Sequence, residues 1–353
     1  MVGMIRSDLH AIPSYAPGAH HDDALQLSSN EATQPPLPEI TEVMVRAAAE
    51  ANRYPDITAT KLREELAQHL GVGFDQVAVG TGSSALCQQL VHITTVGGEE
   101  VIFPWRSFEA YPIFVQVVGA RPIPVPLDAD HRVDLAAIAD KITADTRLIF
   151  VCNPNNPSGT TVTKAEFAEF MDVVPSDVLV VLDEAYIEYN RNADTPLGTE
   201  LFGTYPNVVF LRTFSKAYGL AGVRVGYAFG PEEIIAALNK VAIPFSINSV
   251  AQAGARAALT AQDSLRERTE ETCQQRERVE KELAEWGVPH SETNHVWLPA
   301  ENIKKLGTPQ ELATRLAEHG VLVRAFNDGV RITITTEEET NALLRAWSDA
   351  IGG

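Results

Sequence analysis

The sequence predicts an α/β protein, with a large domain built on a mainly parallel sheet covered by helices and a smaller α+β domain after it. Short runs rich in Val and Ile alternate with amphipathic helical stretches through the first two thirds of the chain. Most of these runs lack two-residue alternation, so both faces of each strand should be covered, as in a parallel sheet. The 353 residues are enough for a sizeable core and two domains.

The chain divides into three parts. Residues 1–40 are rich in Pro, Gly, Ser and Asn, which predicts an extended N-terminal arm. Residues 41–248 should form the large domain, in which strands and helices alternate. The expected strands are 77–80, 101–103, 148–152, 178–182, 208–211 and 223–228, and the expected helices are 39–51, 58–70, 84–93, 108–118, 133–141 and 164–173.

Residues 249–353 should form the small domain with its linking helix. A long helical region over 249–286 is charged in its second half, which suits a bridge between two domains. The remaining pattern mixes short apolar runs with amphipathic stretches, as expected for an α+β unit. The expected strands are 295–298, 321–325 and 330–335, and the expected helices are 308–319 and 337–350.

Composition excludes several classes of protein. The net charge of −19 argues against a nucleic-acid partner, although a few Arg side chains can still bind small anions. No run of 18 apolar residues is present, so no membrane partner is expected, and the first ten residues do not resemble a signal peptide. Cys87, Cys152 and Cys273 are far apart and lack metal-ligand spacing, which favours inert thiols in a reducing cytoplasm and no metal site.

Polar residues follow three of the predicted strands, at the sheet edge where α/β proteins bind ligands. Asn153-Pro-Asn-Asn-Pro-Ser-Gly159, Asp183-Glu-Ala-Tyr186 and Arg212-Thr-Phe-Ser-Lys216 each come directly after a strand, and Arg224 lies a little further on. Taken alone, each has an ordinary explanation as a turn, a helix cap or a surface lysine. Their order and spacing together are more specific.

In that order and spacing the chain resembles the fold-type I pyridoxal-phosphate (PLP) enzymes, within the histidinol-phosphate and aromatic amino acid aminotransferase group. The resemblance runs from Tyr15 to Arg331 and implies PLP as cofactor. It implies that Lys216 holds PLP as a Schiff base and moves the substrate proton. Asp183 would face the pyridine nitrogen, while Tyr186 and Asn156 would hydrogen-bond the ring's 3-oxygen.

The cofactor phosphate needs several donors and a positive field. Gly82, Ser83 and Ser84 lie where a strand gives way to a helix, so free backbone N–H groups suit an anion there. The third glycine of a dinucleotide fingerprint is absent, which argues against a dehydrogenase. By resemblance, Ser215 and Arg224 are further phosphate ligands.

Two aromatic residues match further cofactor contacts of the family. The resemblance implies that Tyr54 reaches the phosphate of the neighbouring subunit, in a homodimer with shared active sites. Phe108 matches the aromatic side chain that stacks on the cofactor ring. The alternatives are a turn tyrosine packed on its own domain and ordinary packing of Phe108 against Tyr111.

Four residues bear on the substrate. Arg324 and Arg331 match positions that grip its anionic group, with structural ion pairs as the alternative. Tyr15 matches a substrate-contacting tyrosine given by the other subunit. Trp105, in Trp105-Arg-Ser-Phe-Glu109, looks like the segment of actinobacterial aromatic (phenylalanine) aminotransferases, where an indole would form an apolar wall.

The predicted activity is transfer of the amino group of an aromatic L-amino acid to a 2-oxo acid such as 2-oxoglutarate, with a role in amino-acid biosynthesis. Histidinol-phosphate aminotransferase is the alternative, but residues 32–34 read Ala-Thr-Gln where that group continues with Asn-Pro. A PLP-dependent lyase would keep Lys216 and Asp183. A PLP-binding regulator would need a DNA-binding module, for which the chain has neither spare N-terminal length nor basic charge.

Overall fold

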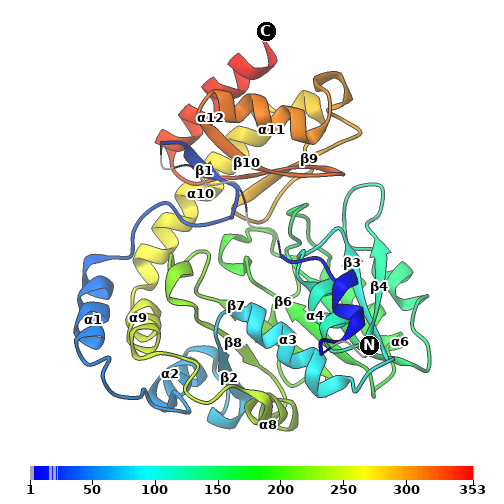
Figure 1. Ribbon diagram of the computed structural model, residues 1–353, viewed down its shortest axis with the longest axis vertical. Coiled ribbons are helices and arrows are strands. Elements are labelled where there is room, and N and C mark those ends of the chain that lie inside the picture. Colours follow the sequence, from blue (N-terminus) through cyan, green and yellow to red (C-terminus); the bar gives the residue numbers. More distant parts are fainter. Residues whose placement is uncertain (1–3, 16–17, 19–20, 22, 353) are drawn as a thin grey trace.

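The computed structural model describes residues 4–15, 18, 21 and 23–352. A large unit surrounds a seven-stranded sheet and a small unit surrounds a four-stranded sheet, joined by a long helix (Figure 1). In the larger sheet every neighbouring pair is parallel except the two pairs that involve β8. Its strands in spatial order are β2 (Val77–Gly80), β8 (Gly226–Phe229), β7 (Val208–Thr213), β6 (Leu179–Asp183), β5 (Thr146–Cys152), β3 (Glu100–Trp105) and β4 (Arg121–Pro126).

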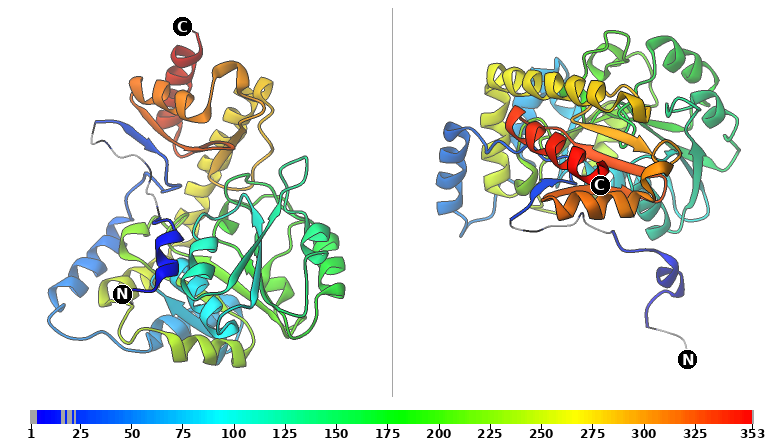
Figure 2. Two further views of the ribbon diagram at one scale, coloured as in Figure 1. Left: turned by 45° about the vertical axis from the view of Figure 1, so that its right-hand side comes forward. Right: turned by 90° about the horizontal axis from the view of Figure 1, so that it is seen from above.

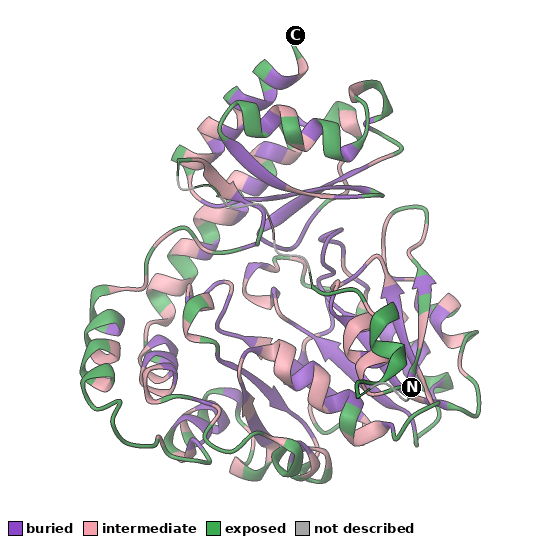
Figure 3. Cartoon of the chain, viewed as in Figure 1, coloured by how far each residue is buried: buried purple, intermediate pink, exposed green. Residues whose placement is uncertain are grey.

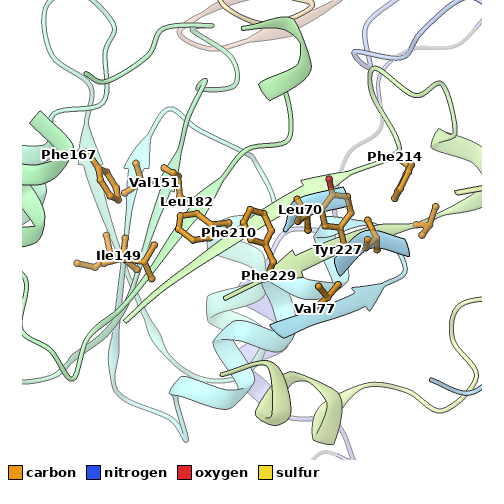
Figure 4. Close-up of a cluster of buried hydrophobic side chains, with 14 of the residues drawn as sticks. Leu70, Val77, Ile149, Val151, Phe167, Leu182, Phe210, Phe214, Tyr227 and Phe229 are labelled. Atoms are coloured by element: carbon orange, nitrogen blue, oxygen red, sulfur yellow. The ribbon is translucent and has the colours of Figure 1, made fainter. Parts of the chain in front are cut away.

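Helices cover both faces of this sheet, which confirms the predicted three-layer arrangement. Strands β5 and β6 are almost entirely buried, as expected for strands without alternation (Figure 3). Figure 4 shows one of the two cores, in which Phe167, Phe210 and Phe229 are packed among aliphatic side chains. The helices are α1 (Pro38–Ala49), α2 (Thr60–Leu70), α3 (Ser83–Thr94), α4 (Tyr111–Val117), α5 (Leu135–Ala139), α6 (Lys164–Val173), α7 (Gly198–Leu201), α8 (Glu232–Val241) and α9 (Ser249–Thr260).

Two strands of the larger sheet depart from the sequence-based expectation. Strand β4 was not predicted, because Pro122, Pro124 and Pro126 interrupt its pattern. It lies at the sheet edge and pairs only with β3, so the missing proline N–H groups leave no partner unsatisfied. Strand β8 begins at Gly226 rather than at 223, because residues Ala221–Val223 form a 3-10 turn and Arg224 has a φ of 61°.

The small unit has the strand order β1-β10-β11-β9. Strand β1 comes from the N-terminal arm and pairs in parallel with β10, with Leu25 opposite Val321 (Figure 2). An arm that joins this sheet was not visible in the sequence, because three residues are too short to show a strand pattern. The elements are β1 (Leu25–Leu27), α10 (Gln262–Glu282), β9 (His295–Pro299), α11 (Pro309–Glu318), β10 (Val321–Phe326), β11 (Gly329–Thr333) and α12 (Glu337–Ile351).

The helical region 249–286 is two helices rather than one. Ala261 separates them: it is the C-cap of α9 and the N-cap of α10. Helix α9 packs on the large unit, where Gly254 lies so close to α1 that a Cβ would stand 2.8 Å from the sulfur of Met44. Helix α10 then runs to the small unit. Short 3-10 helices also occur at Ser7–Ala11, Phe74–Gln76, Ile187–Tyr189, Ala221–Val223, Ala284–Trp286 and Lys304–Leu306. Among the described residues, no helix combines the length and the apolar composition that a membrane span requires.

One buried ion pair supports the strand edge that carries the site. Glu184, fully buried after β6, accepts from Arg212 Nε at 2.8 Å and from the Gly198 backbone N–H at 2.6 Å. Removing one member of such a pair leaves an uncompensated charge in the core. Glu184→Gln is therefore expected to lower the free energy of unfolding by about 3 kcal/mol, measured by urea unfolding at a fixed cofactor concentration.

Glu200→Gln is the matched control for this prediction. Glu200 pairs with Lys164 at 2.8 Å, but both side chains are about half exposed. Its loss should cost less than about 1 kcal/mol. Equal effects of the two substitutions would contradict a supporting role for the buried pair.

Candidate active site

A cavity of about 390 Å³ lies between the carboxyl ends of β5, β6 and β7, the start of α3 and the small sheet. This is the edge at which the sequence placed its polar residues. Phe108, Ile113 and Phe114, on and before α4, form an apolar side of it. The sequence-predicted site residues that line it are Tyr15, Ser83, Ser84, Phe108, Asn156, Asp183, Tyr186, Ser215, Lys216, Arg224, Arg324 and Arg331.

Lys216 follows β7 and projects into the cavity. Its Nζ donates to the backbone oxygen of Ser29 at 3.0 Å and lies 5.9 Å from the ring centroid of Tyr186. Burial, together with the positive charge of Arg331, lowers the pKa of this amine to about 7. A large fraction of the amine is therefore neutral at physiological pH, and the neutral form is the nucleophile and base.

Asp183 is the last residue of β6 and is buried. Its Oδ2 accepts a hydrogen bond of 2.6 Å from the Tyr111 hydroxyl, whereas its Oδ1 has no partner among the described residues. Burial raises the pKa of this carboxyl group to about 6. A buried carboxylate oxygen without a partner is costly, so the site suits a cationic donor opposite Asp183.

Several donors converge at the start of α3. Gly82 has a φ of 77°, and a Cβ there would stand 2.5 Å from Arg224 Nη2, so only glycine lets the guanidinium approach this turn. Arg224 Nη1 donates to Ser215 Oγ at 3.2 Å. Together with Ser83 and Ser84 in the first turn of the helix, these groups form a cradle for an anion.

A hydrogen-bonded group connects the N-terminal arm to the opposite wall. Arg331 donates to Asn156 Oδ1 at 2.7 Å and to the Ser28 backbone oxygen at 2.6 Å. Asn30 Nδ2 donates to the Tyr186 hydroxyl at 2.9 Å. These contacts fix the arm, Asn156 and Tyr186 around the cavity.

Three predicted residues, Gly82, Trp105 and Tyr54, are not among the residues that line the cavity. Trp105 was expected to form an apolar wall, but its ring packs edge-on to Phe103 at 6.1 Å and below the guanidinium of Arg106 at 4.7 Å. Residues two apart on a strand point to the same face, which places Trp105 beside Phe103. Tyr54 is 82% exposed and stacks on Phe245 at 4.6 Å, away from the cavity of its own chain.

Tyr15 is placed differently from the expectation. It was expected to reach the site of the other subunit, but in this structure it lines the cavity of its own chain. Further along the arm, β1 pairs with β10 and the Ser28 backbone oxygen accepts from Arg331.

Three residues of this region were missed in the sequence. Tyr111 was considered only as a packing partner of Phe108, Asn30 was not singled out, and Glu109 was read only as part of a motif. Each acts through a contact that crosses the fold: Tyr111 to Asp183, Asn30 to Tyr186 and Glu109 to Arg324. Only the spacing of Tyr111 from Phe108 gave a signal, and it pointed to packing.

Comparison with known proteins agrees with this geometry. Residues 22–346 match the family model of aminotransferase class I and II. The chain belongs to this family. The aminotransferase is 60% identical to a protein of Corynebacterium diphtheriae named aromatic amino acid aminotransferase, over 98% of both chains. A protein of Nocardia farcinica with the same name is 52% identical over 99% of this chain and 98% of its own.

Solved structures confirm the predicted fold of the aminotransferase. Histidinol-phosphate aminotransferase from Sinorhizobium meliloti, in complex with pyridoxal-5'-phosphate, superimposes with a TM-score of 0.88 at 27% identity, over 100% of this chain and 98% of that chain. Aspartate aminotransferase from Thermus thermophilus with maleate reaches a TM-score of 0.82 at 23% identity, over 98% and 99%. The second likeness shows the fold alone.

Proposed function

We propose that the chain is a PLP-dependent aminotransferase that moves the amino group of an aromatic L-amino acid to a 2-oxo acid such as 2-oxoglutarate. One observation carries the proposal: a lysine amine whose pKa is lowered to about 7, a buried carboxylate oxygen with no partner among the described residues, and an anion cradle face one cavity. The relatives named aromatic amino acid aminotransferase, at 52 and 60% identity, support the aromatic substrate.

The cavity offers a group for each polar end of PLP. The amine of Lys216 suits the aldehyde, and the free oxygen of Asp183 suits the protonated pyridine nitrogen. Asn156 and Tyr186 suit the ring's 3-oxygen. The proposed phosphate ligands are Gly82, Ser83, Ser84, Ser215 and Arg224, with Tyr54 from the neighbouring subunit, and Phe108 would stack on the ring.

When bound, PLP supplies the electron sink that stabilises negative charge at the substrate Cα. The chain's own residues do the rest. Lys216, with its pKa lowered to about 7, can accept the proton from Cα and later release it, because both of its protonation states are populated near neutral pH. Asp183 holds a positive charge in place, since a cation opposite its free oxygen stabilises the ionised carboxylate.

The substrate would be held at its two ends. Arg331, whose partners are a neutral amide and a backbone oxygen, is suited to bind the carboxylate of an amino acid. Phe108, Ile113 and Phe114 would contact the aromatic ring. Histidinol phosphate remains the alternative donor, because Arg324 lies beside Arg331 and two guanidinium groups can bind a phosphate.

Initial-rate kinetics with L-phenylalanine and 2-oxoglutarate test this function. Because the amino group stays on the enzyme after the first oxo acid leaves, double-reciprocal plots at several fixed 2-oxoglutarate concentrations should give parallel lines. Intersecting lines would contradict the two-half mechanism. Release of carbon dioxide without an oxo acid product would indicate a lyase instead.

We also propose a homodimer in which each subunit completes the other's site. Tyr54 and Phe245 form a stacked pair on the surface, with Ile57 and Ile243 exposed in the same two loops. Exposed apolar side chains of this size are typical of interfaces.

The three cysteines of the chain are buried and free, which supports a reducing cytoplasm as its compartment.

Mixing an impaired variant with an inactive one tests the shared site. Tyr54→Ala is expected to lower activity about tenfold at limiting cofactor, because one phosphate hydrogen bond is lost. Lys216→Ala should be inactive. A hybrid dimer of the two has one site with both native residues, so mixing after mild dissociation should raise the activity above that of Tyr54→Ala alone. Unchanged activity on mixing would contradict a shared site.

A further inference from the structure

Three arginine side chains lie around the ring of Phe326, and two of them, Arg324 and Arg331, line the cavity. The guanidinium carbons of Arg106, Arg324 and Arg331 lie 4.9, 5.5 and 5.7 Å from the ring centroid of Phe326. Arg324 and Arg331 are also directly opposite each other on β10 and β11, so they project from the same face of the small sheet. Like charges placed this closely repel each other, and their compensation decides which anion the site can bind.

Carboxylates compensate two of the three. Arg106 Nε lies 2.7 Å from Asp328 Oδ1, and Arg324 Nη2 lies 3.1 Å from each carboxylate oxygen of Glu109. Arg331 has neutral partners, and in the part of the chain that the structure describes no carboxylate forms an ion pair with it. Of the two arginines that line the cavity, Arg331 is therefore the one without an ion-pair partner among the described residues.

Glu109 is positioned to act on the ligand as well as on Arg324. It stands between Phe108 and Ala110, which both line the cavity, and its side chain is 25% exposed while that of Arg324 is 13% exposed. Partial burial makes an ion pair of this kind stronger than one on the surface. The pair also joins the segment before α4 to the small sheet, so the charge of Glu109 stays at this end of the cavity.

We propose that Glu109 is a specificity-determining residue that disfavours donors whose anionic group is a phosphate relative to donors whose anionic group is a carboxylate. The inference rests on the proposed function and refines its substrate class. A carboxylate carries one negative charge and is balanced by Arg331. A phosphate monoester carries nearly two at pH 8, needs a second cation, and would find Arg324 held by Glu109 and the Glu109 carboxylate close by.

Binding of two matched ligands tests the inference without turnover. The ligands are 3-phenylpropionate and 2-phenylethyl phosphate, which share the phenyl ring and differ in the anion. Their dissociation constants are measured by calorimetry at pH 8 on the PLP-loaded enzyme, for the native protein and for Glu109→Gln. Glutamine keeps a hydrogen-bond acceptor for Arg324 but removes the charge, so 2-phenylethyl phosphate should bind about tenfold more tightly. Binding of 3-phenylpropionate should change less than about threefold.

Asp328→Asn is the matched control. Like Glu109, Asp328 forms an ion pair between the large and the small unit, in this case with Arg106, and the substitution removes its charge. Asp328 pairs with Arg106, which does not line the cavity, whereas Glu109 pairs with Arg324, which does, so neither ligand should gain affinity from Asp328→Asn. If Glu109→Gln changes both ligands equally, or leaves the phosphate unchanged, the inference is wrong. The binding test needs no reaction. A failure of the enzyme to transaminate L-phenylalanine would therefore refute the proposed function, while the change in the two dissociation constants would still show whether Glu109 selects between the anions.

Discussion

Lys216→Ala is expected to lose turnover by a factor of about 10⁴ or more. The variant loses both the amine that binds the cofactor covalently and the group that moves the Cα proton. The fold should be unaffected, because among the described residues the Lys216 side chain hydrogen-bonds only to the Ser29 backbone oxygen. The measurement is oxo-acid formation from L-phenylalanine, with the visible absorbance of the protein recorded in parallel.

Two further variants separate chemistry from charge. Lys216→Arg keeps a positive charge but has no neutral amine near pH 7, so it should be as inactive as the alanine variant. Lys240→Ala removes an exposed lysine at the end of α8 and should keep full activity. A Lys216→Ala protein with native activity would refute the assigned role.

Asp183→Asn is expected to give the second largest loss, about 10³-fold in kcat. The amide has the same shape and can still accept from the Tyr111 hydroxyl, but it carries no charge to hold a proton on the pyridine nitrogen. The dissociation constant of PLP should rise as well, since a buried charge-assisted hydrogen bond is lost. Equilibrium titration with PLP and steady-state rates measure the two effects.

Tyr111→Phe is the control for Asp183→Asn. It removes the hydrogen bond of 2.6 Å to Oδ2 and leaves the carboxylate charge in place. We expect a loss of about tenfold, much smaller than that of Asp183→Asn. If the two losses were equal, the orientation of Asp183 rather than its charge would be the important property.

The sequence predicted the parts of the fold that local pattern determines. Strands such as 148–152 and 178–182 were found because apolar runs that end in polar loops are distinctive in α/β proteins. Strand β4 was missed because its prolines are compatible with a strand only at a sheet edge, and edge position is a property of the whole sheet. Strand β1 was missed because its partner lies almost 300 residues away.

The candidate site shows the same division. The cluster of Asp183, Lys216 and Arg224 was predictable because each follows a strand whose end faces the same edge. Trp105 lies outside the cavity lining, because which face of a strand points toward a cavity depends on register, and its contact with the substrate stays a prediction. The pairing of Glu109 with Arg324 joins segments 215 residues apart, and no local pattern predicts such a contact.

The central claim concerns the substrate, and a direct comparison of specificity constants tests it. The values of kcat/KM for L-phenylalanine, L-tyrosine and histidinol phosphate are measured side by side with 2-oxoglutarate as the acceptor. Both aromatic amino acids are expected to have a kcat/KM at least about tenfold above that of histidinol phosphate. A specificity constant for histidinol phosphate equal to or above that for L-phenylalanine would contradict it.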